Sequence, residues 1–188
     1  MSSPQYLAYD EMNSRLFVTD SGNNRITVYD VASITNGENA VNVLGQTSFT
    51  SSTVAPTQSN FAGINGGAAY DGTNSRLFAV DNVACRVLVY DAASITNGEN
   101  AVNVLGQTSF TSSTCDAARA RFNNPLGVAY DPHSAFLYVS DVFSATPTST
   151  DRVTVFDVAS ITDGESATGV IGQDSFTGTQ TGVSQSLI

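Results

Sequence analysis

The sequence predicts an all-β fold, a β-propeller with three four-stranded blades in one chain. Three observations predict it. The segment ASITNGENAVNVLGQTSFTSST occurs at residues 32–53 and again, letter for letter, at 93–114, and a diverged copy spans 159–180. Each repeat of about 60 residues contains short alternating segments rich in β-branched and aromatic residues, and no long stretch of helical period. Four antiparallel strands repeated at this period are typical of a propeller blade.

The repeats cover nearly the whole chain. They form one half-propeller domain over residues 2–188, with units at 2–62, 63–122 and 123–188. The alignment shifts by one residue before Phe122 and by six residues between Asp141 and Arg152. Both shifts fall in polar or Pro-containing stretches, where loops tolerate changes of length.

In the first unit we expect strands at residues 5–10, 15–20, 25–31 and 40–46. The first strand keeps Ala at one position of every unit, as expected where strands crowd near a propeller axis; these are Ala8, Ala69 and Ala129. The second strand has apolar residues on both faces, Leu16 and Val18 alternating with Phe17, which predicts a sheet buried between two others. The third strand begins with Arg in every unit. Before the fourth strand, Asn36-Gly37 can take the positive φ of a tight turn.

Two stretches resemble the NHL repeat family. NNPLGVAYD and LYVSD in the third unit, and RLFVTDSGNNRITVYD in the first, are similar to its pattern of Pro-x-Gly-apolar-Ala-x-Asp, an apolar strand ending in Asp, and a short Gly/Asn turn leading to Arg. The third unit carries Pro125 and Gly127, the second lacks the Pro, and the first has Tyr6 where Gly is expected. The resemblance implies a propeller, often six-bladed, whose first strands line the channel. The duplicated segment would then hold the outermost strand.

Three blades leave two sheet faces without a neighbouring blade. The last letters, LI, followed by SSPQYLAYD align without a gap on RFNNPLGVAYD from Arg121, so the end of the chain matches what should precede its start. Either the chain is cut from a longer array, or two copies join in a closed six-bladed homodimer about a two-fold axis. We expect the homodimer. A monomeric open fragment, another oligomer number and a strand-swapped assembly are the alternatives.

Charge and composition exclude some partners. The net charge is −10, and all seven basic residues are Arg. A nucleic-acid phosphate backbone would be repelled, so no nucleic-acid partner is expected. No apolar run approaches the roughly 18 residues of a membrane span, and MSSPQYLAYD lacks the features of a signal peptide. Abundant Ser, Thr and Asn weakly favour an extracellular or cell-surface protein.

The two cysteines, Cys85 and Cys115, both lie in the second unit. The other units have neither, so the pair occurs together or not at all. The second connection of a blade and its exit to the next blade lie on the same face, which makes a disulfide reasonable. It would close a 30-residue loop and imply an oxidising compartment. Two free thiols are the alternative, because the sequence does not give the Cα separation.

Charged residues recur at three positions of the repeat. Asp10, Asp71 and Asp131 end the first strands, and we expect each to accept hydrogen bonds from backbone N–H groups of its own turn. A ring of such carboxylates could instead bind a cation. The same turn role suits Asp20, Asp81 and Asp141. Arg25, Arg86 and Arg152 are expected to pair with a neighbouring Asp or to bond carbonyls between blades.

No catalytic residue, cofactor site or metal site is predicted. His133 is the only histidine and lies in a DPHS turn, where we expect it to be exposed. No Ser or Cys nucleophile has a base beside it by motif. The main hypothesis is therefore a non-catalytic scaffold or interaction module that binds protein or glycan. The alternative is a metal-dependent hydrolase or lyase acting in the channel, since some NHL-like propellers are lactonases or lyases. A metal site built on several histidines is excluded by the single His, and a carboxylate-based site stays open.

A specific contact is expected in the parts unique to one unit. The third unit alone carries the extended VFSATPTSTD loop, with Phe143 as an apolar tip and Pro147 stiffening the turn. Arg119 and Arg121, in DAARARFNN, are expected on the same face. These residues form the candidate interaction loop. An ordinary length variant is the alternative.

Overall fold

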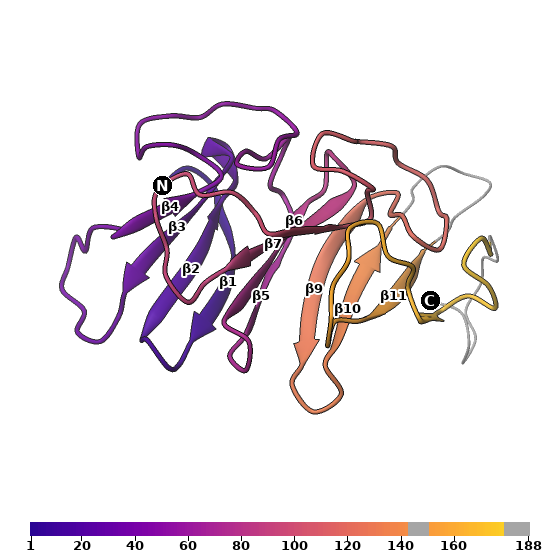
Figure 1. The fold of residues 1–188 in the computed structure, drawn as a ribbon. Coiled ribbons are helices and arrows are strands. Elements are labelled where there is room, and N and C mark those ends of the chain that lie inside the picture. The colour runs from indigo at the N-terminus through magenta and orange to yellow at the C-terminus, as the bar shows by residue number, and fades with distance from the viewer. Residues whose placement is uncertain (143–150, 179–188) are drawn as a thin grey trace.

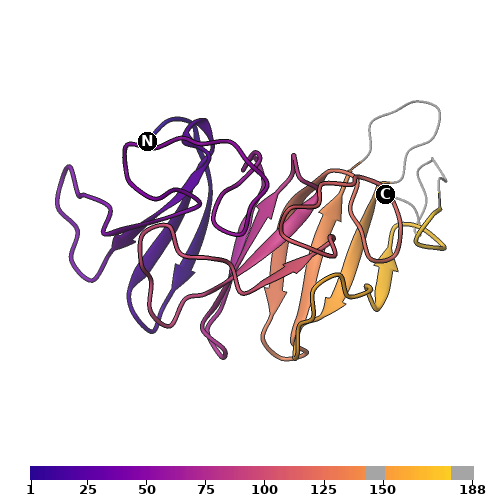
Figure 2. The same ribbon diagram turned by 45° about the horizontal axis from the view of Figure 1, so that its top comes forward.

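We analysed a computed structural model that describes residues 1–142 and 151–178. The chain forms three four-stranded antiparallel sheets, in each of which the strands lie side by side in chain order. Figures 1 and 2 show the sheets arranged in a row, with the first sheet at one end and the third at the other. No helix in these residues is long and apolar enough to cross a bilayer.

Each repeat supplies one sheet, as the sequence predicts. The first contains β1 (Pro4–Asp10), β2 (Arg15–Asp20), β3 (Arg25–Asp30) and β4 (Asn42–Leu44), with a short 3-10 helix, η1 (Ser21–Asn23), between β2 and β3. The second contains β5 (Ala68–Asp71), β6 (Arg76–Asp81), β7 (Arg86–Asp91) and β8 (Asn103–Leu105). The third contains β9 (Pro125–Asp131), β10 (Phe136–Asp141), β11 (Arg152–Asp157) and β12 (Gly169–Ile171). The outermost strands are shorter than expected; after β4, the chain turns away at Gly45, whose φ is 80°.

The sheets pack face to face through two apolar clusters. In the first cluster Phe17 and Val28 of the first sheet meet Leu77 and Tyr90 of the second, and all four are fully buried. The second cluster joins the second and third sheets in the same way. The middle sheet is therefore buried on both faces, which is what its two apolar faces predicted.

A phenylalanine from each connecting segment completes each cluster. Phe61 lies against Gly45 at the end of β4, and Phe122 lies against Gly106 at the end of β8. The two phenylalanines are thus equivalent, so the one-residue shift predicted before Phe122 falls after it. A Cβ atom at either glycine would lie 2.2 Å from the phenylalanine ring. Since both glycines also have positive φ, no other residue fits these two positions without rearrangement.

The recurring Asp–Arg pairs link β2 and β3 to the connecting segments. Three buried ion pairs join Asp20 to Arg25, Asp81 to Arg86, and Asp141 to Arg152, at 2.8, 2.8 and 2.9 Å. Each Arg also donates to the carbonyl of a phenylalanine that follows the outermost strand of its sheet; these are Phe49, Phe110 and Phe176. Arg86 and Arg152 further donate to carbonyls of the segment that enters their sheet. Both roles expected of these arginines are confirmed.

A disulfide joins Cys85 and Cys115, with their Cα atoms 5.4 Å apart. Cys85 closes the β6–β7 turn with a φ of 51°, and Cys115 lies in the connection that leads to the third sheet. The structure therefore has the disulfide and not the two free thiols that were its alternative. The bond holds the turn of one sheet to the entry of the next.

Replacing both cysteines with serine is expected to lower the free energy of unfolding by about 3 kcal/mol, because the bond restricts the unfolded chain over a 30-residue loop. Urea denaturation followed by circular dichroism measures the change. Reduction should destabilise the unmodified protein by a similar amount and leave the double serine variant unchanged. Equal stability of the two proteins under oxidising conditions would contradict the prediction.

Candidate functional site

The inner strands end in aspartates whose carboxylates accept hydrogen bonds from the turns that follow them. Asp71 accepts hydrogen bonds from the backbone N–H groups of Thr73 and Asn74, at 3.0 and 3.2 Å, and from Arg76 Nε at 2.9 Å. Burial raises the pKa of Asp71, but the hydrogen bonds from Asn74 and Arg76 outweigh it and hold the pKa below its ordinary value. Asp10 has the same environment in the first sheet. The expected turn role of these carboxylates is therefore confirmed.

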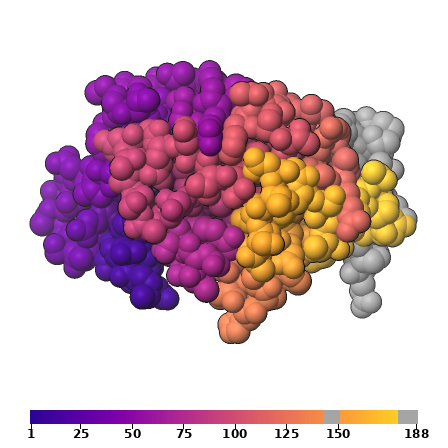
Figure 3. Space-filling view, viewed as in Figure 1, coloured from indigo at the N-terminus to yellow at the C-terminus, as the bar shows by residue number. Residues whose placement is uncertain are grey.

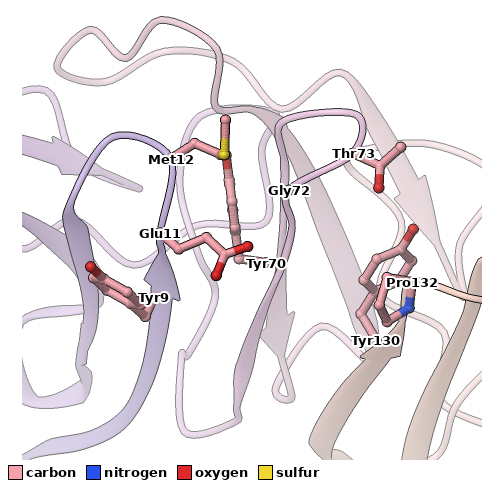
Figure 4. Close-up of a pocket in the computed structure, with 8 residues that line it drawn as sticks. All are labelled: Tyr9, Glu11, Met12, Tyr70, Gly72, Thr73, Tyr130 and Pro132. Carbon is pink, nitrogen blue, oxygen red and sulfur yellow. The ribbon is translucent and has the colours of Figure 1, made fainter.

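A cavity of about 380 Å³ lies where these turns converge. Figure 4 shows three tyrosines from the same position of the three repeats along it, Tyr9 and Tyr130 at opposite ends and Tyr70 between them. Tyr70 stacks on Phe17 of the first sheet, and Tyr130 packs on Phe78 of the second, each with ring centroids 5.8 Å apart. The remaining lining residues are Glu11, Met12, Gly72, Thr73 and Pro132. We call this cavity the tyrosine pocket.

The lining of the tyrosine pocket decides which groups it can hold. Its surface is polar and apolar in nearly equal parts, and the lining includes three tyrosines, Thr73 and Glu11. Glu11 is its one charged side chain, and none of the lining residues is basic. Burial raises the pKa of Tyr70 and of Tyr130. The Tyr70 hydroxyl is itself buried and has no hydrogen-bond partner among the described residues, so Tyr70 offers the pocket its ring and not its hydroxyl. The pocket therefore suits neutral or cationic groups and disfavours phosphate.

The loop before each outermost strand reaches back to the preceding sheet. Val43 N–H of β4 donates to the side-chain oxygen of Asn97 at 3.0 Å, and Gly98 N–H donates to the Val43 carbonyl at 3.0 Å. The same two bonds join the third repeat to β8, where Asp163 and Gly164 hold Val104 at 3.0 and 3.2 Å. Figure 3 shows a part of the second repeat, in pink, lying against the purple surface of the first repeat. We call this pair of bonds the clasp.

The clasp was missed from the sequence. Its Asn-Gly and Asp-Gly pairs predict tight turns only, and Gly98 and Gly164 do have the positive φ of such turns, 72° in each. A Cβ atom at Gly98 would lie 2.8 Å from Thr47 Cα, and one at Gly164 would lie 3.0 Å from the Thr108 side chain. Glycine is thus required here for the close approach of two sheets as well as for the turn.

Known structures give the fold a wider context. No protein-family model and no curated protein matches the chain. A candidate 6-phosphogluconolactonase from Bacteroides uniformis matches with a TM-score of 0.55 and 13% identity over 89% of this chain. Hydrazine synthase of Kuenenia stuttgartiensis matches with a TM-score of 0.55 and 12% identity over 91%. These likenesses agree with three meander sheets packed face to face, their inner strands β1, β5 and β9 next to one another.

The chain has a propeller-like all-β fold. Each sheet is therefore a blade. The identities are too low to indicate more than the fold, and the chain spans 40% of the first of these proteins and 36% of the second. A protein of unknown function from Bacteroides thetaiotaomicron also matches, with a TM-score of 0.48 and 18% identity over 84% of this chain and 34% of that one. The similarity to NHL repeats stays a resemblance.

Arg119 and Arg121 of the predicted interaction loop both make contacts within the chain. Arg119 donates to the Ala167 carbonyl at 2.7 Å, and its guanidinium carbon lies 5.2 Å from the centre of the Phe176 ring. Arg121 pairs with Asp116, and both side chains are partly exposed. Phe143 and Pro147 lie outside the described residues. A partner for this loop stays a prediction.

Potential metal ligands are dispersed. In residues 1–142 and 151–178, no three His, Cys, Asp or Glu side chains lie together in a group that could hold a metal ion. His133 is exposed, as expected, with Nδ1 3.4 Å from Asp131 Oδ1. Asp131 accepts hydrogen bonds from Ser134 Oγ and His133 N–H, which hold its pKa below the ordinary value.

Proposed function

We propose that this protein is a non-catalytic interaction module that binds a glycan through the tyrosine pocket. The observation that carries the proposal is that a tyrosine from every blade lines one pocket, which has a single charged side chain. A sugar ring has an apolar C–H face that packs on an aromatic ring and a rim of hydroxyls that bond to Tyr, Thr and carboxylate oxygens. A protein segment is the second class of ligand, and binding to peptides but not to sugars would favour it.

A panel of neutral and acidic oligosaccharides tests the glycan proposal. The chain has no tryptophan, and three of its seven tyrosines line the pocket, so a ligand that binds there should change the tyrosine fluorescence. Tyr130→Ala is expected to weaken binding about tenfold, because it removes one wall of the pocket. Phe49→Ala is the matched control, since Phe49 is an exposed aromatic residue outside the pocket. Equal loss in the two variants, with both folded by circular dichroism, would count against the pocket.

The alternative function is a metal-dependent hydrolase or lyase. The likeness to a candidate 6-phosphogluconolactonase raises lactone hydrolysis as its most specific form. A phosphorylated substrate fits the tyrosine pocket poorly, because the pocket offers Glu11 and no basic group. Elemental analysis after dialysis and titration of acid release from 6-phosphogluconolactone test it together. A stoichiometric metal with hydrolysis above the uncatalysed rate would favour the enzyme over the binding module.

A further inference from the structure

The loop between β3 and β4 of the first blade lacks the contacts that its two copies make. It extends from the left edge of the molecule, away from the other blades (Figure 1). Ile34 is 74% exposed, whereas Ile95 and Ile161 at the same position pack against the two apolar clusters. No atom outside its own turn lies within 4 Å of where a Cβ would be at Gly37. The loop at residues 32–38 thus has the same sequence pattern as its two copies, but among the described residues it contacts no strand of another blade.

The outward face of the first blade is apolar and exposed at two positions, although Val18 and Thr27 in its middle are already buried. Leu7 is 62% exposed, whereas Ala68 at the same position of the second blade is 8% exposed. Tyr29 is half-buried, whereas its counterpart Tyr90 is fully buried between two blades. These positions form the face that, in the second and third blades, packs on the blade before.

The third blade presents the complementary surface. Ile171 of β12 is 51% exposed, while Leu44 and Leu105 at the same position are fully buried under the next blade. Val170 pairs with Thr154 of β11 as Val43 pairs with Thr27 of β3. Val170 therefore directs its N–H and carbonyl groups outward, as Val43 does toward its clasp. Within the described part of the chain, no clasp loop follows β12.

We propose that loop 32–38 of one copy of this chain clasps β12 of a second copy, so that the first blade of each packs on the third blade of the other. Asn36 would accept from Val170 N–H, and Gly37 N–H would donate to the Val170 carbonyl. We choose a second copy as the partner because the two unpaired surfaces complement each other. Loop 32–38 and the outward face of the first blade match what β12 and the outward face of the third blade would bind. The inference goes beyond the proposed function and does not depend on glycan binding.

The contact is head-to-tail, because it joins different surfaces of the two copies. Its geometry therefore decides whether the assembly is a closed ring or an open filament. Two copies that make it twice form a closed ring, whereas a contact that does not close gives an open filament. The chain already contains two such junctions, which orient successive blades around adjacent inner strands. One difference is expected at the new junction. Gly169 stands where β4 and β8 have Asn42 and Asn103, so the extra side-chain bonds of those residues are absent there.

Light scattering after size exclusion tests the proposal with the full chain. The unmodified protein should have twice the 19.6 kDa mass of one chain. Ile34→Glu in the clasp loop and Ile171→Glu on the other surface should each raise the dimer dissociation constant at least about 30-fold, because a charge replaces an apolar contact. Asn36→Ala should raise it about tenfold. Val102→Glu is the matched control, since Val102 is 49% exposed on the middle blade and should leave the mass unchanged.

Mixing gives a sharper result. Each of the two Glu variants keeps one intact surface, and together they can form one complete junction, so an equimolar mixture should recover dimer that neither variant forms alone. A folded unmodified protein of 19.6 kDa at micromolar concentration would overturn the proposal. So would a filament, or a dimer that Ile34→Glu and Ile171→Glu leave intact. Glycan titrations of the monomeric variants show separately whether the tyrosine pocket works.

Discussion

Replacement of Asp81 by alanine is expected to lower the free energy of unfolding by about 3–5 kcal/mol, because it leaves a buried guanidinium without its carboxylate. The side chains of Asp81 and Arg86 are both fully buried. Asp81 also accepts hydrogen bonds from the backbone N–H groups of Ala62 and Gly63, each at 3.0 Å. The variant therefore leaves these two donors without their acceptor as well. Urea denaturation at fixed protein concentration measures the change.

An exposed ion pair provides the matched control, because it shows how much stability is lost when an Asp–Arg pair that is not buried is broken. Asp116 pairs with Arg121 in the next connection, but the two side chains are 39% and 41% exposed. Asp116→Ala is therefore expected to cost less than about 1 kcal/mol. Similar losses in the two variants would contradict the idea that the buried Asp–Arg pairs fix β2, β3 and the connecting segments in each blade.

Phe122→Ala is expected to cost about 3–5 kcal/mol, because it opens a cavity between the second and third blades. The ring is fully buried, lies against Gly106 and packs on Phe156 with centroids 5.5 Å apart. Phe61→Ala removes the equivalent ring from the first junction and should cost a similar amount. Denaturation of both variants measures the effect. A loss below about 1 kcal/mol for either would show that the connecting phenylalanines are not part of the core.

Much of the fold could be predicted because the repeat places the same residues at the same positions three times. The alternation in each unit predicts four strands, and the two apolar faces of the second strand predict a buried sheet, which the middle blade is. The joint occurrence of Cys85 and Cys115 in one unit points to their disulfide. These inferences depend on local pattern and on symmetry, both of which a sequence contains.

The site depends on contacts between repeats, which the sequence does not specify. Tyr9, Tyr70 and Tyr130 stand in one column, yet that column says nothing about a shared cavity until the turns are brought together. The clasp has the same origin, since Asn97 and Val43 are far apart in the chain. The identity of the duplicated segment extends through its loop, but identity between two copies does not by itself place the loop against another blade.

The central claim is that the first and third blades supply the two halves of a junction like those inside the chain. Hydrogen exchange at the amide of Val170, compared with Val43 and Val104, tests it most directly, because all three occupy the clasp position of their strand. The account predicts that Val170 is protected like Val104 at concentrations where the mass is doubled, and that it exchanges rapidly on dilution. Fast exchange of Val170 at every concentration, with Val43 and Val104 protected, would contradict it.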